Sequence, residues 1–95
     1  MKRLYYCNAH YDRDTLISYN TTIIKFEKNR CVLNVYRSMT TYMHIRKYRD
    51  RLYEIGQAKK AHIVDVLYNR MIFNKSARRI MYFIKDEKVV DLYEF

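Results

Sequence analysis

The stretch TIIKFEKNRCVLNVYR, residues 22–37, decides the fold. Apolar and charged residues alternate in its first half and its second half is rich in β-formers, so we expect strands over 22–27 and 31–37. Lys28-Asn29-Arg30 separates the two strands, and asparagine tolerates a positive φ in a tight turn. The stretch therefore predicts an antiparallel hairpin with Asn29 in the left-handed region.

Weaker strand signals flank this hairpin on both sides. Residues 3–7 and 15–21 predict two short strands, and the polar run 10–14 between them predicts a loop. At the other end of the chain, 79–84 and 88–93 predict a closing hairpin around the acidic pair Asp86-Glu87.

From Thr40 onward the apolar period changes to that of a helix. Thr41, Ile45, Tyr48, Leu52 and Ile55 share one face of a helix over 40–55. Gly56, the only glycine, follows where a left-handed C-terminal cap is needed. Residues 59–73 repeat the helical pattern less cleanly, and 62–68 also alternates as a strand would; we favour a second helix.

These elements predict an α+β fold. An antiparallel sheet, made of an N-terminal meander and the C-terminal hairpin, packs against one or two helices. With 95 residues and 11.8 kDa the chain predicts one domain over 1–95. Hydrophobic residues make up 49% of the chain and proline is absent, which excludes disordered, collagen-like and linker-rich classes.

The sequence lacks the motifs of cofactor-dependent enzymes. One glycine cannot build a glycine-rich phosphate loop or a Gly-x-Ser-x-Gly elbow, so we expect a protein that is not an enzyme and takes no cofactor. His10, Asp12 and Asp14 offer a weak alternative, a metal-dependent nuclease, but a solvated turn is the simpler interpretation and we expect no metal site. Cys7 and Cys31 have no metal-ligand spacing and predict reduced, buried thiols.

Positive charge is concentrated in the middle of the chain. Nineteen Lys and Arg against ten Asp and Glu give a formal charge of +9, and residues 37–79 carry +8 of it. Residues 80–95 carry two basic and four acidic groups, or −2. This pattern predicts a polarised molecule whose basic face binds an acidic partner such as nucleic acid.

The expected first helix supplies the candidate interface. Tyr42, Arg46, Arg49 and Tyr53 fall on one stripe beside its apolar face; Lys59 and Lys60 follow in the second helix. Guanidinium groups bind phosphate and phenol rings stack on bases. The alternative is structural: tyrosines and long basic side chains can also flank a core and stabilise it.

The start of this helix is a second candidate site. Ser38, Thr40 and Thr41 are good N-caps, but Met43 takes the place of the acidic residue of a capping box. With His44 and Lys47, the free amides and hydroxyls predict an anion-binding site. Ordinary capping by Ser38 or Thr40 is the competing interpretation.

Part of the chain, residues 18–48, resembles a group of short, uncharacterised proteins encoded by tailed bacteriophages. The motifs that carry the resemblance are Ser18-Tyr19-Asn20-Thr21, Tyr36-Arg37-Ser38 and Thr40-Thr41-x-x-His44-Ile45-x-x-Tyr48. Lys28-Asn29-Arg30 departs from the glycine-containing turn usual in the group. The resemblance carries over no catalytic residue and implies a viral accessory protein that acts in bacterial cytoplasm by binding.

The expected function is therefore that of a small, non-enzymatic phage-type accessory protein. It would bind nucleic acid, or a host nucleic-acid-processing protein, through the Tyr/Arg-rich helical face. The alternative is an anti-defence inhibitor, for example an anti-CRISPR-like one, that binds a host protein directly. The sequence predicts neither a membrane span nor a signal peptide, and an exposed edge strand of the meander makes a homodimer credible.

Overall fold

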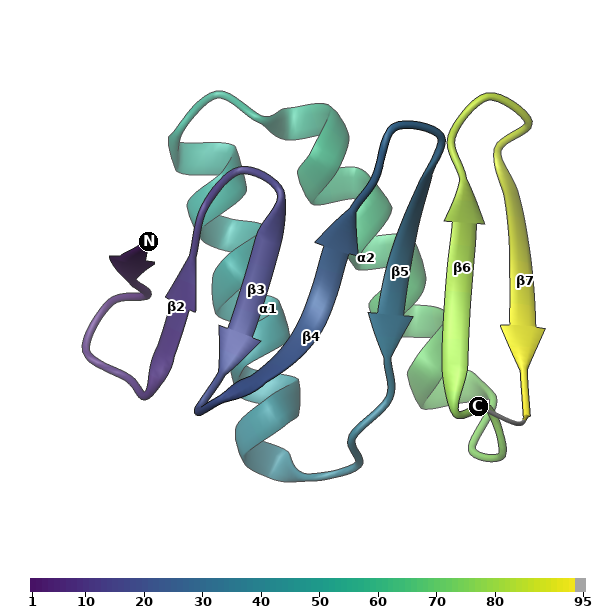
Figure 1. The fold of residues 1–95 in the computed structure, drawn as a ribbon, viewed down its shortest axis with the longest axis horizontal. Coiled ribbons are helices and arrows are strands. Elements are labelled where there is room, and N and C mark those ends of the chain that lie inside the picture. Colours follow the sequence, from purple (N-terminus) through teal and green to yellow (C-terminus); the bar gives the residue numbers. More distant parts are fainter. Residues whose placement is uncertain (94–95) are drawn as a thin grey trace.

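An antiparallel sheet of seven strands forms one layer of the structure within residues 1–93, the part of the chain that this computed structural model describes (Figure 1). The strands are β1 (Lys2–Arg3), β2 (Ala9–Tyr11), β3 (Thr15–Ser18), β4 (Thr21–Phe26), β5 (Arg30–Asn34), β6 (Arg79–Phe83) and β7 (Lys88–Leu92). Their order in the sheet is their order in the chain. Helices α1 (Met39–Glu54) and α2 (Ala58–Phe73) connect β5 to β6 and cover one face of the sheet. The predicted α+β fold is confirmed.

The core lies between the sheet and the helix pair. Strand alternation points Ile24, Leu33 and Ile80, which are opposite one another in β4, β5 and β6, toward the helices, and all three are fully buried. Tyr48 of α1 is fully buried as well, and its hydroxyl donates to the carbonyl of Asp12, 3.0 Å away. Removing this phenol from water raises the pKa of Tyr48 well above its ordinary value.

The central hairpin forms as predicted, but its turn does not. Strands β4 and β5 pair with Phe26 opposite Cys31, and the amide of Glu27 donates to the carbonyl of Arg30 at 2.7 Å. Asn29 does not adopt a positive φ, so the expected left-handed asparagine is wrong. The closing hairpin β6–β7 is confirmed, and its left-handed residue is Glu87.

Both predicted helices are confirmed, with the second one helical over Ala58–Phe73 rather than extended. Gly56 has φ +78°, and the last turn of α1 closes onto it through the bond from the Gly56 amide to the Tyr53 carbonyl. The glycine therefore supplies the left-handed cap that the sequence predicted.

The N-terminal predictions need three corrections. The strand expected over 3–7 ends at Arg3, because Tyr5 has a φ of +51° and the chain turns there. The loop expected over 10–14 begins with β2, in which Ala9 and Tyr11 are buried on the core face and His10 is exposed. The strand expected over 15–21 breaks at Tyr19, whose φ is +55°. Two left-handed tyrosines, which sterics disfavour, account for two of these errors.

The cysteines are free and buried, as predicted, and Cys7 lies in the loop after β1. Its thiol donates to the carbonyl of Leu4 at 2.8 Å. Burial raises the pKa of the Cys31 thiol far above its ordinary value. In the described part of the chain, neither helix combines the length and the apolar character that a membrane span requires.

Candidate nucleic-acid interface

The connections between elements fall at two opposite ends of the molecule (Figure 1). Because successive elements run in opposite directions, each connection alternates between these ends. The lower end in Figure 1, which we call the basic end, contains the connections 4–8, 19–20, 35–38 and 74–78. The upper end, which we call the acidic end, contains the connections 12–14, 27–29, 55–57 and 84–87.

The two sets of connections carry opposite charge. Those of the basic end hold three cations and no carboxylate, and the cations are Arg37, Lys75 and Arg78. Those of the acidic end hold five carboxylates against three cations; the carboxylates are Asp12, Asp14, Glu27, Asp86 and Glu87. The excess positive charge therefore lies at one end of the sheet as well as on the helical half of the chain.

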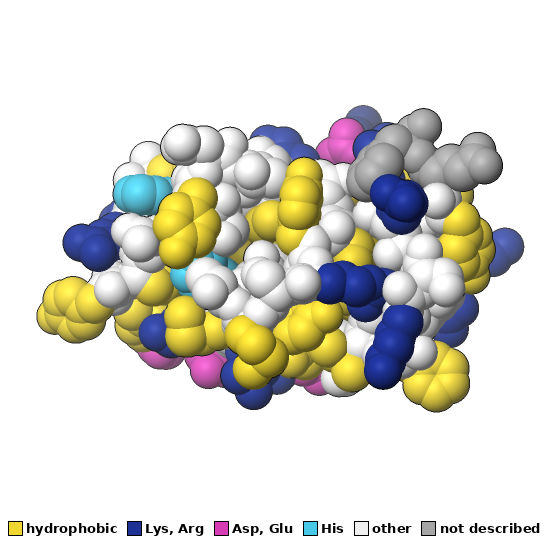
Figure 2. All heavy atoms as spheres, turned by 90° about the horizontal axis from the view of Figure 1, so that it is seen from below, with side chains coloured by type: hydrophobic (Ala, Val, Ile, Leu, Met, Phe, Trp, Pro, Cys, Tyr) yellow, Lys and Arg dark blue, Asp and Glu magenta, His cyan; other side chains and the backbone are white. Residues whose placement is uncertain are grey.

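Exposed aromatic rings gather at the same end. Within residues 1–93 six aromatic side chains are exposed, and five of them belong to the basic end or to its rim: Tyr6 (97%), Tyr19 (59%), Tyr36 (48%), Phe73 (86%) and Tyr93 (53%). The sixth, Tyr53, lies near the end of α1. Figure 2 views this end directly: yellow and dark blue side chains spread across it, and magenta ones lie at its margins.

A shallow hollow of about 270 Å³ opens at the basic end. It is lined by Val35, Arg37, Lys75, Ser76, Ala77 and Arg78. Among the described residues that line the hollow, Arg37, Lys75 and the Ser76 hydroxyl offer donors and none is a carboxylate, which suits an anion with several acceptor oxygens.

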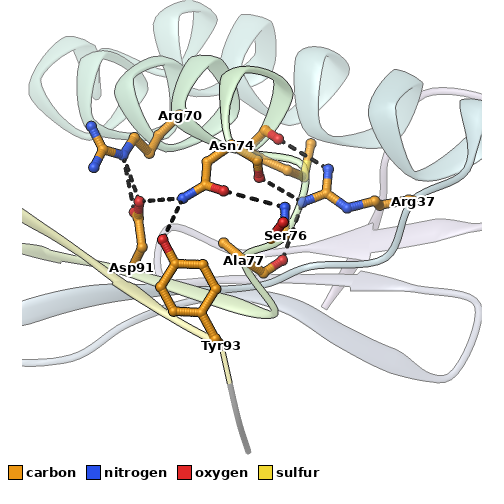
Figure 3. Close-up of polar contacts among 8 residues, drawn as sticks. Arg37, Arg70, Asn74, Ser76, Ala77, Asp91 and Tyr93 are labelled. Carbon is orange, nitrogen blue, oxygen red and sulfur yellow. Dashed lines mark hydrogen bonds and ion pairs between the residues drawn. The ribbon is translucent and has the colours of Figure 1, made fainter.

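Arg37 is held in place by the end of α2 (Figure 3). Its guanidinium donates to the carbonyls of Met71 (3.0 Å), Asn74 (2.7 Å) and Ala77 (3.1 Å). Carbonyls at the C-terminal end of a helix lack helical partners and attract cations. The arginine therefore joins the β5–α1 connection to the α2–β6 connection and fixes the wall of the hollow.

Asn74 continues this network toward β7. Its side-chain amide donates to Asp91 (2.7 Å) and to the Tyr93 hydroxyl (2.9 Å), and its side-chain carbonyl accepts from the Ser76 amide (3.2 Å). Asp91 is also paired with Arg70 at 2.9 Å, and its side chain is only 6% exposed. Asp91 thus ties α2 and the α2–β6 connection to β7 through Arg70 and Asn74.

At the start of α1, where an anion site was predicted, the side chain of Ser38 bonds to Thr41 of the same helix. Ser38 accepts the Thr41 amide (3.1 Å) and donates to the Thr41 hydroxyl (3.0 Å), which is the ordinary capping that we weighed against it. Thr41 and His44 are buried, while Thr40 and Lys47 are partly exposed. The structure does not bring the five predicted residues together around an open space.

His44 instead joins α1 to the sheet. Its Nδ1 lies 2.7 Å from the Ser18 hydroxyl, and the two side chains are 1% and 5% exposed. Burial, followed by the charge of Lys47, lowers the pKa of His44 below its ordinary value of 6.5. The histidine is therefore neutral at pH 7, and its contact with Ser18 fastens β3 to the helix.

The predicted stripe on the helical face is only partly open. Tyr42 packs edge-on against Tyr68 of α2, with ring centroids 6.3 Å apart. Arg49 bonds to Asp65 (2.8 Å) and to Asp50 (3.2 Å), and the Asp65 bond raises its pKa. Tyr42 and Arg49 therefore contact α2 instead of facing only solvent, as in the structural alternative.

The remaining predicted interface residues divide in the same way. Lys60 lies 2.5 Å from Asp14 and also donates to the Arg13 carbonyl. Arg46, Tyr53 and Lys59 are exposed and make no ion pair within residues 1–93. Three of the six predicted interface residues are thus available on the surface, and they are spread along the helix layer.

The weak metal-site alternative finds no support in the described residues, where no three His, Cys, Asp or Glu side chains gather to hold an ion. Asp12 accepts the Asp14 amide at 2.8 Å, as in a solvated turn. The hydrogen bond from Lys60 lowers the pKa of Asp14 below its ordinary value of 3.8.

The basic end is the feature that segment-by-segment charge counting missed. Arg37 and Lys75 are far apart in sequence but line one hollow, because the helix pair leaves the sheet and returns at the same end. The available signal was the antiparallel order itself, which assigns alternate connections to opposite ends.

The residues that carry the resemblance to phage proteins also meet in space. Ser18 contacts His44, and Ser38 contacts Thr41, so the motif joins β3 to the start of α1 through internal contacts of the fold. Comparison of the chain with protein-family models, with curated proteins and with solved structures finds no match.

Proposed function

We propose that this protein binds single-stranded nucleic acid through its basic end and acts by binding, without catalysis. The observation that carries the proposal is the segregation of five exposed aromatic side chains and three cations at one end, whose connections contain no carboxylate. As the resemblance to phage proteins implies, its place of action would be a bacterial cytoplasm.

The chemistry of these side chains suits a flexible, unpaired strand. Aromatic rings offer stacking faces to bases, worth about 1–3 kcal/mol per base, and basic side chains follow the phosphates. In a duplex the bases are already stacked and face one another, so isolated rings find no free base to contact. Tyr19 and Tyr36 lie in two different connections and Phe73 ends α2, which favours successive contacts along one strand.

The hollow beside Arg37 gives the proposal a phosphate contact. The guanidinium is already fixed by three carbonyls, so binding costs little further ordering of this side chain. Lys75 lines the same hollow and makes no ion pair within residues 1–93. A phosphate there would meet the guanidinium of Arg37 and the ammonium of Lys75.

The decisive test compares two exposed tyrosines of nearly equal exposure. Tyr36 (48%) belongs to the basic end, and Tyr53 (52%) belongs to the helical stripe. Affinity for a labelled single-stranded oligonucleotide, as DNA and as RNA, is measured by fluorescence anisotropy at two salt concentrations. We expect Tyr36→Ala to weaken binding roughly tenfold or more, by the loss of one stacked base, and Tyr53→Ala to leave affinity nearly unchanged.

A lysine pair makes the corresponding test of charge. Lys75→Ala should flatten the slope of log affinity against log salt by about 0.7–1, whereas Lys85→Ala at the acidic end should not change it. Loss of binding with Tyr53→Ala and Arg46→Ala, but not with Tyr36→Ala, would move the interface to the helical face. Absence of binding by the unmodified protein at low salt would overturn the proposal.

One observation favours the second candidate, an inhibitor that binds a host protein. Met39 (77%) and Phe73 (86%) expose large apolar side chains at the rim of the basic end, and such residues often anchor protein interfaces. A partner retained from nuclease-treated lysate by the unmodified protein, but not by Phe73→Ala, would support this function. A partner that disappears after nuclease treatment would support nucleic acid instead.

A further inference from the structure

The two edges of the sheet differ in how they are protected. One edge is β1, only two residues long, and both residues are cations. Short edge strands with charged side chains resist pairing with another chain. The other edge is β7, five residues long, with the sequence KVVDL. The meander edge, where the sequence made a dimer credible, is thus the protected edge, and the open edge belongs to the C-terminal hairpin.

Two of the five residues of β7 direct their backbone groups toward this open edge. The amide of Val35 donates to the carbonyl of Arg78, and the amide of Ile84 donates to that of Asn29, so even-numbered residues of β6 bond to β5. Odd-numbered residues of β6 therefore bond to β7, where Lys88, Val90 and Leu92 lie opposite them. The N–H and C=O groups of Val89 and Asp91 are left pointing away from the sheet.

Charge is compatible with a second copy of this chain at the open edge. The chain carries +9, so most of its surface repels another copy. β7 is an exception, because it holds one cation, Lys88, and one carboxylate, Asp91, and is neutral overall. A strand of nucleic acid finds no net positive charge in β7 to bind.

We propose that β7 pairs antiparallel with β7 of a second copy about a two-fold axis at Val90. Val90 lies opposite the partner's Val90, and Val89 exchanges both backbone hydrogen bonds with the partner's Asp91. Lys88 lies opposite the partner's Leu92. The pairing uses the backbone groups that face outward and joins the two sheets into one.

Neighbouring registers bring like charges together. Moving the axis to Val89 places Asp91 opposite the partner's Glu87, and moving it to Asp91 places two copies of Asp91 opposite each other. Like charges directly opposite one another destabilise an antiparallel pair, and a shift by one residue would place core-facing side chains opposite uncovered ones. The axis at Val90 avoids both problems.

The pairing also continues an apolar row on the face of the sheet that the helices leave uncovered. Val32, Met81 and Val90 lie opposite one another on that face and are partly buried. Across the axis, Val90 would cover the partner's Val90 and bury more of this row. The antiparallel arrangement points the two basic ends in opposite directions, and the pairing itself is made by β7. This interface therefore does not depend on the proposed function.

A cysteine at the axis tests the register directly. In this type of antiparallel pair the Cα atoms are about 4.5 Å apart, within the range that a disulfide spans. Val90→Cys should form a covalent dimer under mild oxidation. Lys88→Cys, which faces the partner's Leu92, and the unmodified chain, whose cysteines are buried, should remain uncrosslinked.

Analytical ultracentrifugation tests the association itself. The unmodified chain of 11.8 kDa should reach twice its mass as concentration rises. Val90→Lys places two cations at the axis and should remain monomeric, while Ile17→Lys, on the same uncovered face but at the far side of the sheet, should still dimerise. A monomer at all concentrations, dimerisation of Val90→Lys, or equal crosslinking of Lys88→Cys would overturn the proposal.

Discussion

The basic and acidic ends differ in what their connections carry. Turns join neighbouring strands at both ends, whereas both connections between the helices and the sheet lie at the basic end and the α1–α2 connection lies at the acidic end. The acidic end exposes carboxylates, several of them in ion pairs such as Glu27–Arg30 and Asp14–Lys60. The basic end exposes rings and cations. A uniform charged surface would serve solubility alone, whereas this separation is typical of a surface that binds.

The largest effect should come from removing a ring and a cation together. Tyr36→Ala combined with Lys75→Ala should lower affinity for single-stranded nucleic acid roughly a hundredfold, because a stacked base and a phosphate contact are both lost. Tyr53→Ala combined with Lys85→Ala is the matched control and should stay within about twofold of the unmodified protein. Anisotropy titrations measure both; equal losses would remove the distinction between the ends.

The next effect concerns how each end of α2 is fastened. Arg37→Ala removes three charge-assisted hydrogen bonds and should lower the free energy of unfolding by about 2 kcal/mol. Lys60→Ala breaks an exposed ion pair at the other end of α2 and should cost under about 1 kcal/mol. Urea unfolding followed by circular dichroism compares the two variants. A larger loss for Lys60→Ala would contradict this order.

A smaller effect is expected in the α1–α2 connection at the acidic end. Gly56 has φ +78°, although a Cβ there would meet no atom within 4 Å. Gly56→Ala should therefore cost about 1 kcal/mol through backbone strain alone. Thermal unfolding measures the change. An increase in stability would show that this connection can leave the left-handed region without cost.

The smallest expected effect is a change in stability with pH, to which His44 of α1 and Asp14 of the acidic end contribute over different pH ranges. The pKa of His44 is below 6.5 in the folded chain, so the unfolded chain binds more protons and stability falls as pH drops below about 6.5. The pKa of Asp14 is below 3.8, so its stabilisation is present above that pH and is lost only below it. Urea midpoints across pH 5–8 should thus decline mainly through His44.

His44→Asn provides the control for this pH dependence. Asparagine can still bond to Ser18 but does not titrate, so the decline between pH 7 and pH 5 should be smaller in this variant. An unchanged decline would assign the pH dependence to other groups.

Periodicity in the sequence was enough to predict both helices, the central hairpin and the closing hairpin, because each depends on local patterns of apolar residues. The N-terminal strands were harder to predict, since Tyr5 and Tyr19 adopt left-handed conformations that their residue type does not signal. At the candidate site, sequence spacing placed Tyr42 and Arg49 on one stripe, but it could not show that α2 supplies Tyr68 and Asp65 as their partners. The hollow beside Arg37 depends on the return of α2 to the sheet, which only the topology determines.

The order of the strands has a consequence for how the chain folds. Every strand lies beside its sequence neighbour, and only β5 and β6 must find each other across the intervening helices. Folding therefore requires one long loop closure, and the hairpins on either side of it can form from nearby contacts. The Val35–Arg78 backbone bond closes that loop at the basic end, so the step that completes the sheet also assembles the proposed binding surface.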